Sequence, residues 1–231
     1  MTQSSSGTAQ AVVAIDGPSG SGKSTVSKEL ARRLDLGYLD TGAMYRAVAW
    51  WAVHQDIDLN DGEAVVEAAR TAPISISTDP DQQQVSVDGV DVTSAIRSPE
   101  VTSTVSSVST IPAAREILVQ RQRGIIEDSG RRIVAEGRDI TTVVAPDADV
   151  RVLLTASEEA RLSRRGAQLG RSQSKEALAA QVTGRDAKDS KLVNFTDAAD
   201  GVTHLDSSEL SLEQTVTAVL DLVLRAVPEL A

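Results

Sequence analysis

Gly17-Pro18-Ser19-Gly20-Ser21-Gly22-Lys23-Ser24-Thr25 follows the small apolar run at residues 11–15. This stretch matches the P-loop pattern G-x-x-x-x-G-K-[ST], in which backbone N–H groups cradle phosphates, the lysine reaches their outer oxygens and the hydroxyl binds Mg²⁺. Val26, Leu30 and Leu34 then recur at helical spacing. A turn that merely joins a strand to a helix needs neither the lysine nor the two hydroxyl groups after it. The stretch therefore predicts a buried strand, a phosphate-binding loop and a helix whose N-terminus faces the phosphates.

Short apolar segments alternate with helical patterns along most of the chain. Besides residues 12–15, the runs 132–135 and 150–154 have the length of buried strands. The stretch 211–226 carries apolar side chains on one helical face and predicts a closing amphipathic helix. This alternation predicts an α/β fold with a central parallel sheet covered by helices. Ligands of such sheets bind beyond the carboxyl ends of the strands, so polar residues there are the first candidates for a site.

A different pattern interrupts this alternation in the middle of the chain. Residues 74–79 and 84–92 alternate apolar and polar side chains around the turn dipeptide Asp88-Gly89. They predict a small antiparallel β unit inserted into the α/β fold. Because the unit lies between residues 40–46 and the predicted helix 112–127, both of its flanks can face a second substrate.

Positive charge gathers late in an otherwise acidic chain, at Arg161, Arg164, Arg165, Arg171, Arg185, Lys188 and Lys191. Such a run is typical of a solvated helix face, and Glu158 and Glu159 are available as ion-pair partners. Gly166, Gly170 and the polar residues 168–175 favour another interpretation, a hinged helical lid that closes cations over phosphates and excludes water. Both interpretations stay open at this point.

Composition argues against several kinds of chemistry. The 231 residues include no cysteine and only His54 and His204, which excludes disulfides and cysteine nucleophiles and argues against a histidine triad or metal site. A net charge of −10 argues against generic nucleic-acid binding. Residues 1–10 have no signal-peptide pattern and predict a disordered tail, and no apolar run reaches membrane length. We therefore expect a soluble, cytoplasmic protein without a nucleic-acid or membrane partner.

Four motifs together resemble those of the bacterial cytidylate kinases, P-loop enzymes of the nucleoside monophosphate kinase group. They are residues 15–25, Leu39-Asp40-Thr41-Gly42-Ala43-Met44-Tyr45-Arg46, Ala135-Glu136-Gly137-Arg138-Asp139-Ile140-Thr141-Thr142-Val143-Val144 and Arg185-Asp186-Ala187-Lys188-Asp189-Ser190. The resemblance covers nearly the whole chain, and the inserted β unit matches the extended monophosphate-binding region of this family. It implies Mg²⁺-assisted transfer of the γ-phosphoryl group of ATP to CMP or dCMP, in pyrimidine nucleotide metabolism. We expect the chain to act as a monomer.

The resemblance also implies a role for each matching residue. The ATP-binding residues are Gly17, Pro18, Ser19, Gly20, Ser21, Gly22, Lys23, Ser24 and Thr25, with Ser24 as the Mg²⁺ ligand. The CMP-binding residues are Thr41, Arg46, Ser106, Arg115, Arg138, Asp139, Arg185 and Asp189. The catalytic cations are Lys23, Arg138, Arg185 and Lys191, and the lid arginines are Arg161, Arg164 and Arg165.

Physical reasons accompany several of these roles. Arg115 and Arg185 suit the α-phosphate, because a guanidinium group makes two bonds to phosphate oxygens at once. Asp139 suits the base, because N4 of cytosine donates a hydrogen bond to a carboxylate whereas uracil presents an acceptor there. A general base is not required, since a phosphate oxygen of CMP is already anionic and positioning supplies most of the rate.

The same resemblance divides the chain into four parts. Residues 1–10 are the tail, residues 40–115 the monophosphate-binding region and residues 158–192 the lid, while the core P-loop domain comprises residues 11–39, 116–157 and 193–231. Two residues depart from the family pattern. Lys191 stands where the lid motif has its last arginine, which predicts weaker phosphate clamping. Thr41 stands where many relatives have serine, and its position after Asp40 suits an N-cap as well as a ligand.

Two other functions stay open on the sequence alone. A P-loop kinase for another acceptor, such as shikimate or a different monophosphate, would share the loop and the lid but has no use for the β unit or the turn at residues 136–139. A nucleotide-switch protein would hydrolyse its nucleotide without an acceptor, and no Asn-Lys-x-Asp segment for reading guanine occurs in the chain. Stimulation of ADP formation by an acceptor separates these functions.

Overall fold

A five-stranded parallel sheet forms the centre of the computed structural model, which describes residues 9–168, 195 and 197–231, without the side chains at positions 165, 167 and 168. The strand order is β2 (Gly37–Asp40), β6 (Arg132–Gly137), β1 (Ala11–Asp16), β7 (Val150–Thr155) and β8 (Thr203–Asp206). All four neighbouring pairs are parallel. The three strands expected from the apolar runs are therefore confirmed, with β1 in the middle of the sheet.

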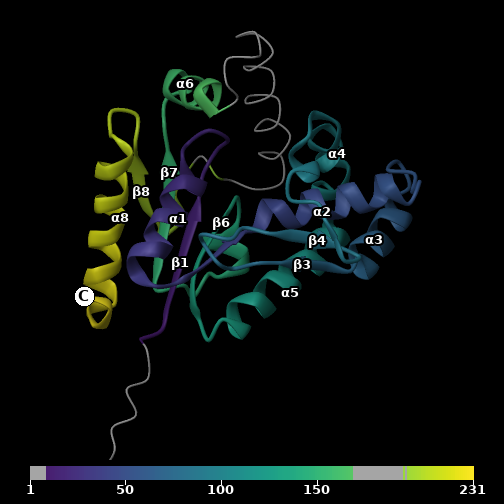
Figure 1. The fold of residues 1–231 in the computed structure, drawn as a ribbon. Coiled ribbons are helices and arrows are strands. Elements are labelled where there is room, and N and C mark those ends of the chain that lie inside the picture. Colours follow the sequence, from purple (N-terminus) through teal and green to yellow (C-terminus); the bar gives the residue numbers. More distant parts are fainter. Residues whose placement is uncertain (1–8, 169–194, 196) are drawn as a thin grey trace, which may run out of the picture.

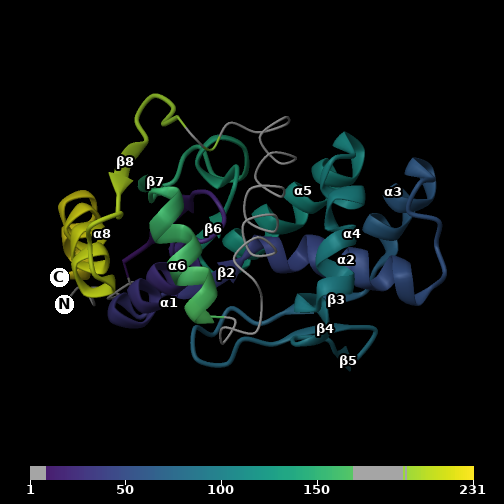
Figure 2. The same cartoon turned by 90° about the horizontal axis from the view of Figure 1, so that it is seen from above.

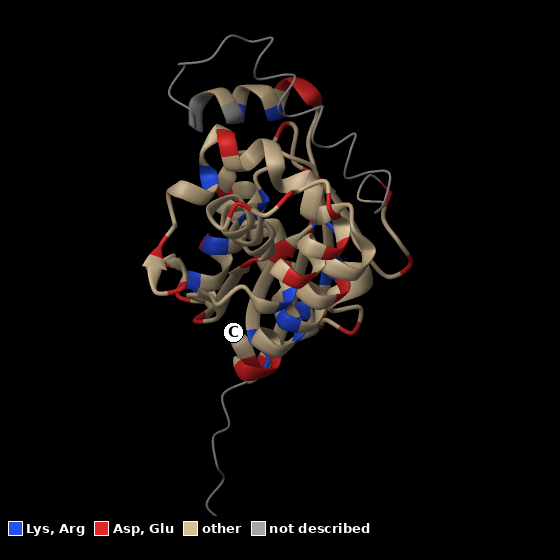
Figure 3. Ribbon diagram, turned by 90° about the vertical axis from the view of Figure 1, so that its right-hand side faces the viewer, with Lys and Arg blue, Asp and Glu red and all other residues tan. Residues whose placement is uncertain are grey.

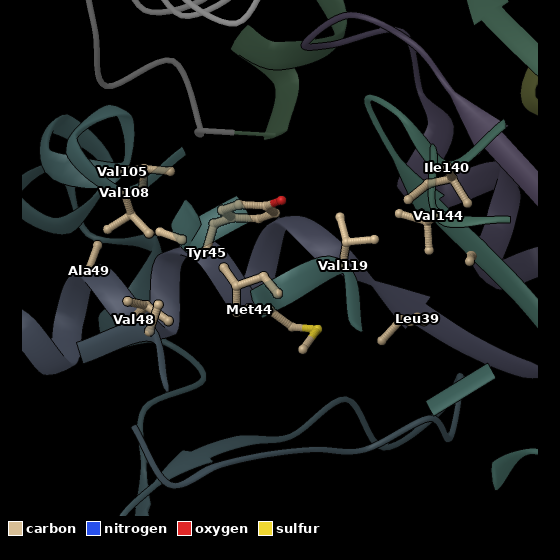
Figure 4. Packing of buried hydrophobic residues seen from close by; sticks show 14 of the residues in the cluster. Leu39, Met44, Tyr45, Val48, Ala49, Val105, Val108, Val119, Ile140 and Val144 are labelled. Carbon is tan, nitrogen blue, oxygen red and sulfur yellow. The ribbon is translucent and has the colours of Figure 1, made fainter. Parts of the chain in front are cut away.

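Alternate side chains of the strands supply two separate cores, one on each face of the sheet. Val13 and Ile15 of β1 pack with α1 (Lys23–Leu34) and α8 (Leu212–Ala226). Val12 and Ala14 face the opposite side, which is covered by α2 (Thr41–His54), α3 (Gly62–Thr71), α4 (Pro99–Ser109) and α5 (Pro112–Asp128) (Figure 1). Figure 4 shows side chains of α2, α4 and α5 in the second core. Burial on both faces explains why the central strands are continuous apolar runs.

The inserted β unit is a three-stranded antiparallel sheet that packs against α2. Its strands are β3 (Ile74–Ile76), β4 (Val85–Val87) and β5 (Val90–Asp91). Asp88 and Gly89 have φ of 50° and 75°, as a two-residue hairpin turn requires. Val85 and Val87 pack with Ala43 and Ala47 of α2 and with Ile96 of the short helix η1 (Ala95–Arg97). Figure 2 shows the unit beside α2 and away from α8. Its antiparallel pairing confirms the prediction from the sequence pattern.

The remaining elements include a π-helical turn, η2 (Ile140–Val144), the helix α6 (Glu158–Gln168) and the terminal η3 (Pro228–Leu230). Only the first part of the predicted lid, α6, lies within the described residues. Arg171, Arg185, Asp189 and Lys191 lie outside them, as do residues 1–8 of the predicted tail. The four-part division of the chain stays a prediction. None of the helices in the described ranges is both long and apolar enough to cross a bilayer.

Candidate active site

The P-loop occupies the carboxyl end of β1, between the central strand and the N-terminus of α1. Gly17 approaches β7 so closely that a Cβ atom there would collide with the Leu154 carbonyl oxygen, so glycine is required. Gly22 caps α1 with a φ of 94°. The Lys23 ammonium donates to the Pro18 carbonyl at 3.3 Å, which folds the side chain back over the loop. Because α1 begins directly after this loop, the free backbone N–H groups of its first turn face the space beyond the sheet.

Glu136 connects the P-loop to the neighbouring strand β6. Its buried carboxylate accepts a hydrogen bond from Ser24 Oγ at 2.6 Å and another from the Tyr38 hydroxyl at 3.1 Å. Lys23 Nζ lies 3.9 Å from the second carboxylate oxygen. Burial, followed by the charge of Glu136, raises the pKa of Tyr38, which keeps this phenol a donor. No role was predicted for Glu136, although it lies in one of the four motifs and at the end of a buried strand.

Ser24 and Glu136 are suited to Mg²⁺, because the ion prefers hydroxyl and carboxylate oxygens and takes only one or two protein ligands beside the substrate phosphates. The described ranges hold no group of three or more Asp, Glu or His side chains arranged around a cation. The two histidines have other contacts, since His54 stacks on Trp50 and His204 hydrogen-bonds Thr155.

The carboxyl end of β2 carries a second cluster of charged groups, beside Glu136. Asp40 is the N-cap of α2 and accepts from the Ala43 N–H at 2.9 Å. The N-cap interpretation of Thr41 is therefore wrong: the residue is the first of the helix, and its buried hydroxyl donates to the Glu136 carbonyl at 2.8 Å. Arg46, expected near the acceptor, donates to Asp40 Oδ2 at 2.8 Å.

Asp139 and Arg115 meet in an ion pair beyond the end of β6. Arg115 also donates to the Ser109 carbonyl at 3.1 Å, and its guanidinium lies 5.7 Å from the centre of the Tyr45 ring. Ser106, half-buried on the same helix as Ser109, accepts from Thr110 through its carbonyl. The structure thus brings together Asp139 and Arg115 from distant parts of the chain, while Ser106 stands on an adjoining helix.

Arg138 points from the same turn toward the P-loop. Its guanidinium donates to the Gly17 carbonyl at 2.7 Å and lies 4.6 Å from the centre of the buried Phe195 ring. The two neighbours Arg138 and Asp139 therefore contact different halves of the site: Arg138 touches the P-loop, and Asp139 pairs with α5. Residues 136–139 join these halves within one short segment.

Asp16, the residue before the P-loop, holds this segment in place. The two oxygens of its buried carboxylate accept from the Ile140 N–H at 2.9 Å, the Thr141 N–H at 2.8 Å and the Thr141 hydroxyl at 2.6 Å. All three donors belong to η2, which begins directly after Asp139. Burial, opposed by these hydrogen bonds and assisted by the charge of Asp139, raises the pKa of Asp16 to about 6.

Replacing Asp16 by Asn is expected to remove one pH-dependent contribution to stability. Because the pKa of Asp16 is about 6 in the folded chain and 3.8 ordinarily, its stabilisation is complete below pH 3.8 and is lost as pH rises through 6. The free energy of unfolding of the wild type, relative to Asp16→Asn, should fall by about 2 kcal/mol between pH 4 and pH 7. Denaturant titrations of both chains at the two pH values measure this, and an equal difference at both would contradict it.

The helix α6 lies against the P-loop through its arginines. Arg161 donates to the Ser19 carbonyl at 3.2 Å, and Arg164 donates to the Ser21 carbonyl at 3.0 Å. Arg164 also contacts the hydroxyl and the carbonyl of Ser207, which follows β8. Figure 3 shows the acidic start of α6 followed by its basic stretch. These two arginines are therefore not purely solvated charges, because they hydrogen-bond the backbone of the P-loop.

Four predicted site residues cannot be placed in the described part of the structure. Arg185, Asp189 and Lys191 lie outside the described residues, as does the side chain of Arg165.

The sheet order, the loop after the central strand and the cations around it define a P-loop kinase. The family model described as cytidylate kinase matches residues 13–225. A cytidylate kinase of Rhodococcus jostii is 49% identical over 217 residues, covering 92% of this chain and 94% of the relative. A cytidylate kinase of Cutibacterium acnes is 46% identical over 217 residues, covering 94% and 97%. The chain belongs to the cytidylate kinase family and is a phosphotransferase.

A solved structure resembles the fold at much lower sequence identity. The crystal structure of an uncharacterized protein from Eubacterium ventriosum superposes with a TM-score of 0.51 at 9% identity, covering 93% of this chain and 98% of that one. At this identity the likeness concerns the fold alone.

Proposed function

We propose that this chain transfers the γ-phosphoryl group of ATP to CMP or dCMP, with the roles assigned below to its own residues. The observation that carries these assignments is the segment 136–139. At its start, Glu136 contacts Lys23 and Ser24 of the P-loop, and at its end Asp139 pairs with Arg115. One short segment thus contacts both the P-loop, which would hold the phosphate donor, and Arg115, which would contact the base of the acceptor. ADP formation that depends on added CMP tests the proposal.

Asp139 and Arg115 bind the base of the acceptor. The amino group of cytosine donates to Asp139, while the guanidinium of Arg115 donates to the acceptor atoms next to it on the ring. Uracil reverses this polarity, presenting its O4 acceptor to the carboxylate and its ring N–H to the guanidinium. The ion pair with Asp139 favours this role for Arg115 over the α-phosphate contact that the resemblance implied.

Lys23 and the N–H groups at the start of α1 hold the transferring phosphoryl group. The transition state spreads charge over three oxygens, so cations that are already in place stabilise it. Lys23 is positioned by the Pro18 carbonyl and by Glu136, and Arg138 is held at the Gly17 carbonyl. An oxygen of the acceptor phosphate attacks the γ-phosphorus in line, and ADP leaves with the electrons of the bond that breaks.

Ser24 and Glu136 are the residues that would hold Mg²⁺. When bound, the ion neutralises charge on the outer phosphates of ATP. Glu136 has a further task, because its carboxylate keeps the Ser24 hydroxyl and the Lys23 ammonium on the same side of the loop.

Replacing Glu136 by Gln is expected to lower kcat by about 10- to 100-fold and to raise the Mg²⁺ concentration needed for half-maximal rate. Gln keeps the shape and one acceptor oxygen but removes the charge that faces Ser24 and Lys23. Steady-state kinetics over a range of Mg²⁺ concentrations measure both effects. Glu213→Gln, on an exposed ion pair with Arg33, is the matched control. An unchanged Mg²⁺ dependence in Glu136→Gln would speak against the assignment.

Several assignments stay predictions. They comprise the α-phosphate contact of Arg185, the CMP contacts of Arg46, Thr41, Ser106 and Asp189, and the catalytic role of Lys191. The cytoplasmic location and the monomeric state are predictions of the same standing.

A further inference from the structure

A cluster of charged groups lies beside the proposed acceptor site, and one of its members, Arg97, has no role assigned so far. Arg97 Nη2 donates to Asp40 Oδ2 at 3.1 Å, and Arg46 Nη2 donates to the same oxygen at 2.8 Å. Because two guanidinium groups share one carboxylate oxygen, they are immediate neighbours. The cluster of Asp40, Arg46 and Arg97 therefore carries an excess positive charge.

Other observations show that the positive charge dominates here. Burial alone would raise the pKa of Asp40, yet the charges of Arg46 and Arg97 hold it below the ordinary value. Burial and the charge of Arg97 lower the pKa of Lys28, which approaches from α1. Among the described residues, buried Arg46 has no hydrogen-bond partner for its Nε atom. These features are expected where an anion belongs to the site.

Arg97 is held firmly in this position, although its side chain is 48% exposed. The preceding residue, Ile96, is fully buried against α2 and the inserted β unit. Gly42 leaves room for the other two members of the cluster, because a Cβ atom there would lie 3.3 Å from an Arg46 nitrogen and 3.2 Å from Asp40 Oδ1. The exposed part of Arg97 thus presents donors to solvent from a fixed backbone.

The cluster also lies close to the P-loop lysine, where the phosphate of the acceptor nucleotide would bind. Asp40 ends β2 and pairs in register with Glu136 of β6, which in turn contacts Lys23. Adjacent strands lie about 4.8 Å apart. Arg97 therefore contacts the end of β2 and Lys23 contacts the end of the neighbouring strand β6. Both ends belong to the edge of the sheet where ligands bind.

We propose that Arg97 is a further substrate-binding residue, which binds the phosphate of the nucleoside monophosphate together with Arg46. This inference rests on the proposed function of the same site. It gives the inserted β unit a task, because the chain returns from β5 through η1 to deliver Arg97 to the end of β2.

Calorimetric titration with CMP and with cytidine, which lacks the phosphate, tests the proposal. Arg97→Ala should bind CMP about 10- to 100-fold more weakly, the range expected for hydrogen bonds to a charged group. Its affinity for cytidine should stay that of the wild type. Arg97→Lys should recover part of the loss, because it keeps the charge but not the two-pronged geometry. Arg70→Ala, an exposed arginine paired with Glu67, is the control and should change neither affinity.

Two results would overturn the proposal. An unchanged CMP affinity in Arg97→Ala would exclude the contact. Equal weakening of CMP and cytidine binding would show that Arg97 has only a structural role, in which its ion pair with Asp40 holds η1 in position. In both cases the wild type would still prefer CMP to cytidine and form CDP, so the proposed function would stand. A wild type that forms no CDP from CMP would instead contradict the proposed function itself.

Discussion

Lys23→Met lowers kcat for CMP-dependent ADP formation by about 100- to 1,000-fold, the loss expected when one preorganised charge is removed from a transition state. The side chain is held between the Pro18 carbonyl and Glu136, so methionine retains much of its packing without its charge. The melting temperature should therefore stay close to that of the wild type. Single-turnover measurements with saturating ATP and CMP separate this loss from an effect on binding.

A control on the same helix shows whether the loss belongs to the site. Arg33→Met removes a cation that pairs with Glu29 and Glu213 away from the P-loop, and its kcat should match the wild type. If Lys23→Met retained a tenth or more of the wild-type kcat, the role assigned to this lysine would be refuted.

Asp139→Ala removes the preference for cytosine. The ratio of kcat/KM for CMP to that for UMP should fall by about 100-fold or more, because the wild-type site leaves buried polar groups unpaired when uracil is present. The loss of kcat/KM for CMP should exceed the loss of apparent affinity for ATP, since this carboxylate pairs with Arg115 of α5. Kinetics with both monophosphates at saturating ATP measure the change.

The ion pair offers a more detailed test of the same assignment. Arg115→Ala and the double variant complete a cycle with Asp139→Ala, and the two effects on base preference should be strongly non-additive because both groups contact one base. Asp147→Ala, at an exposed carboxylate paired with Arg131, should leave the preference unchanged. An equal loss of activity with CMP and UMP in Asp139→Ala would contradict the proposed contact between Asp139 and the base.

Local patterns were enough for the parts of the fold that short segments determine. The P-loop and α1 depend on consecutive residues, and the hairpin at Asp88 and Gly89 follows from alternation around a turn that needs two positive φ angles. The parallel sheet follows from apolar runs buried on both faces. Each of these predictions is confirmed.

Contacts between distant segments were harder to predict. Glu136 reaches Ser24 because β6 lies next to β1, and Arg97 reaches Asp40 because the chain returns from the β unit to the end of β2. The periodicity of apolar residues in the sequence does not indicate which strands are neighbours in the sheet. The same holds for Asp16, whose three donors come from a π-helical turn more than a hundred residues later. The error about Thr41 is of another kind, since either of two adjacent polar residues can cap a helix.

The proposed function of this chain is the phosphorylation of cytidine monophosphates. The most direct test measures ADP formation by the wild type with ATP, Mg²⁺ and matched concentrations of CMP, dCMP, UMP, AMP or shikimate, beside a reaction without acceptor. We expect that CMP or dCMP gives the highest rate, that UMP and AMP are much poorer and that ADP formation without an acceptor is negligible. A rate that is independent of the acceptor, or that is highest with shikimate or AMP, would contradict the account.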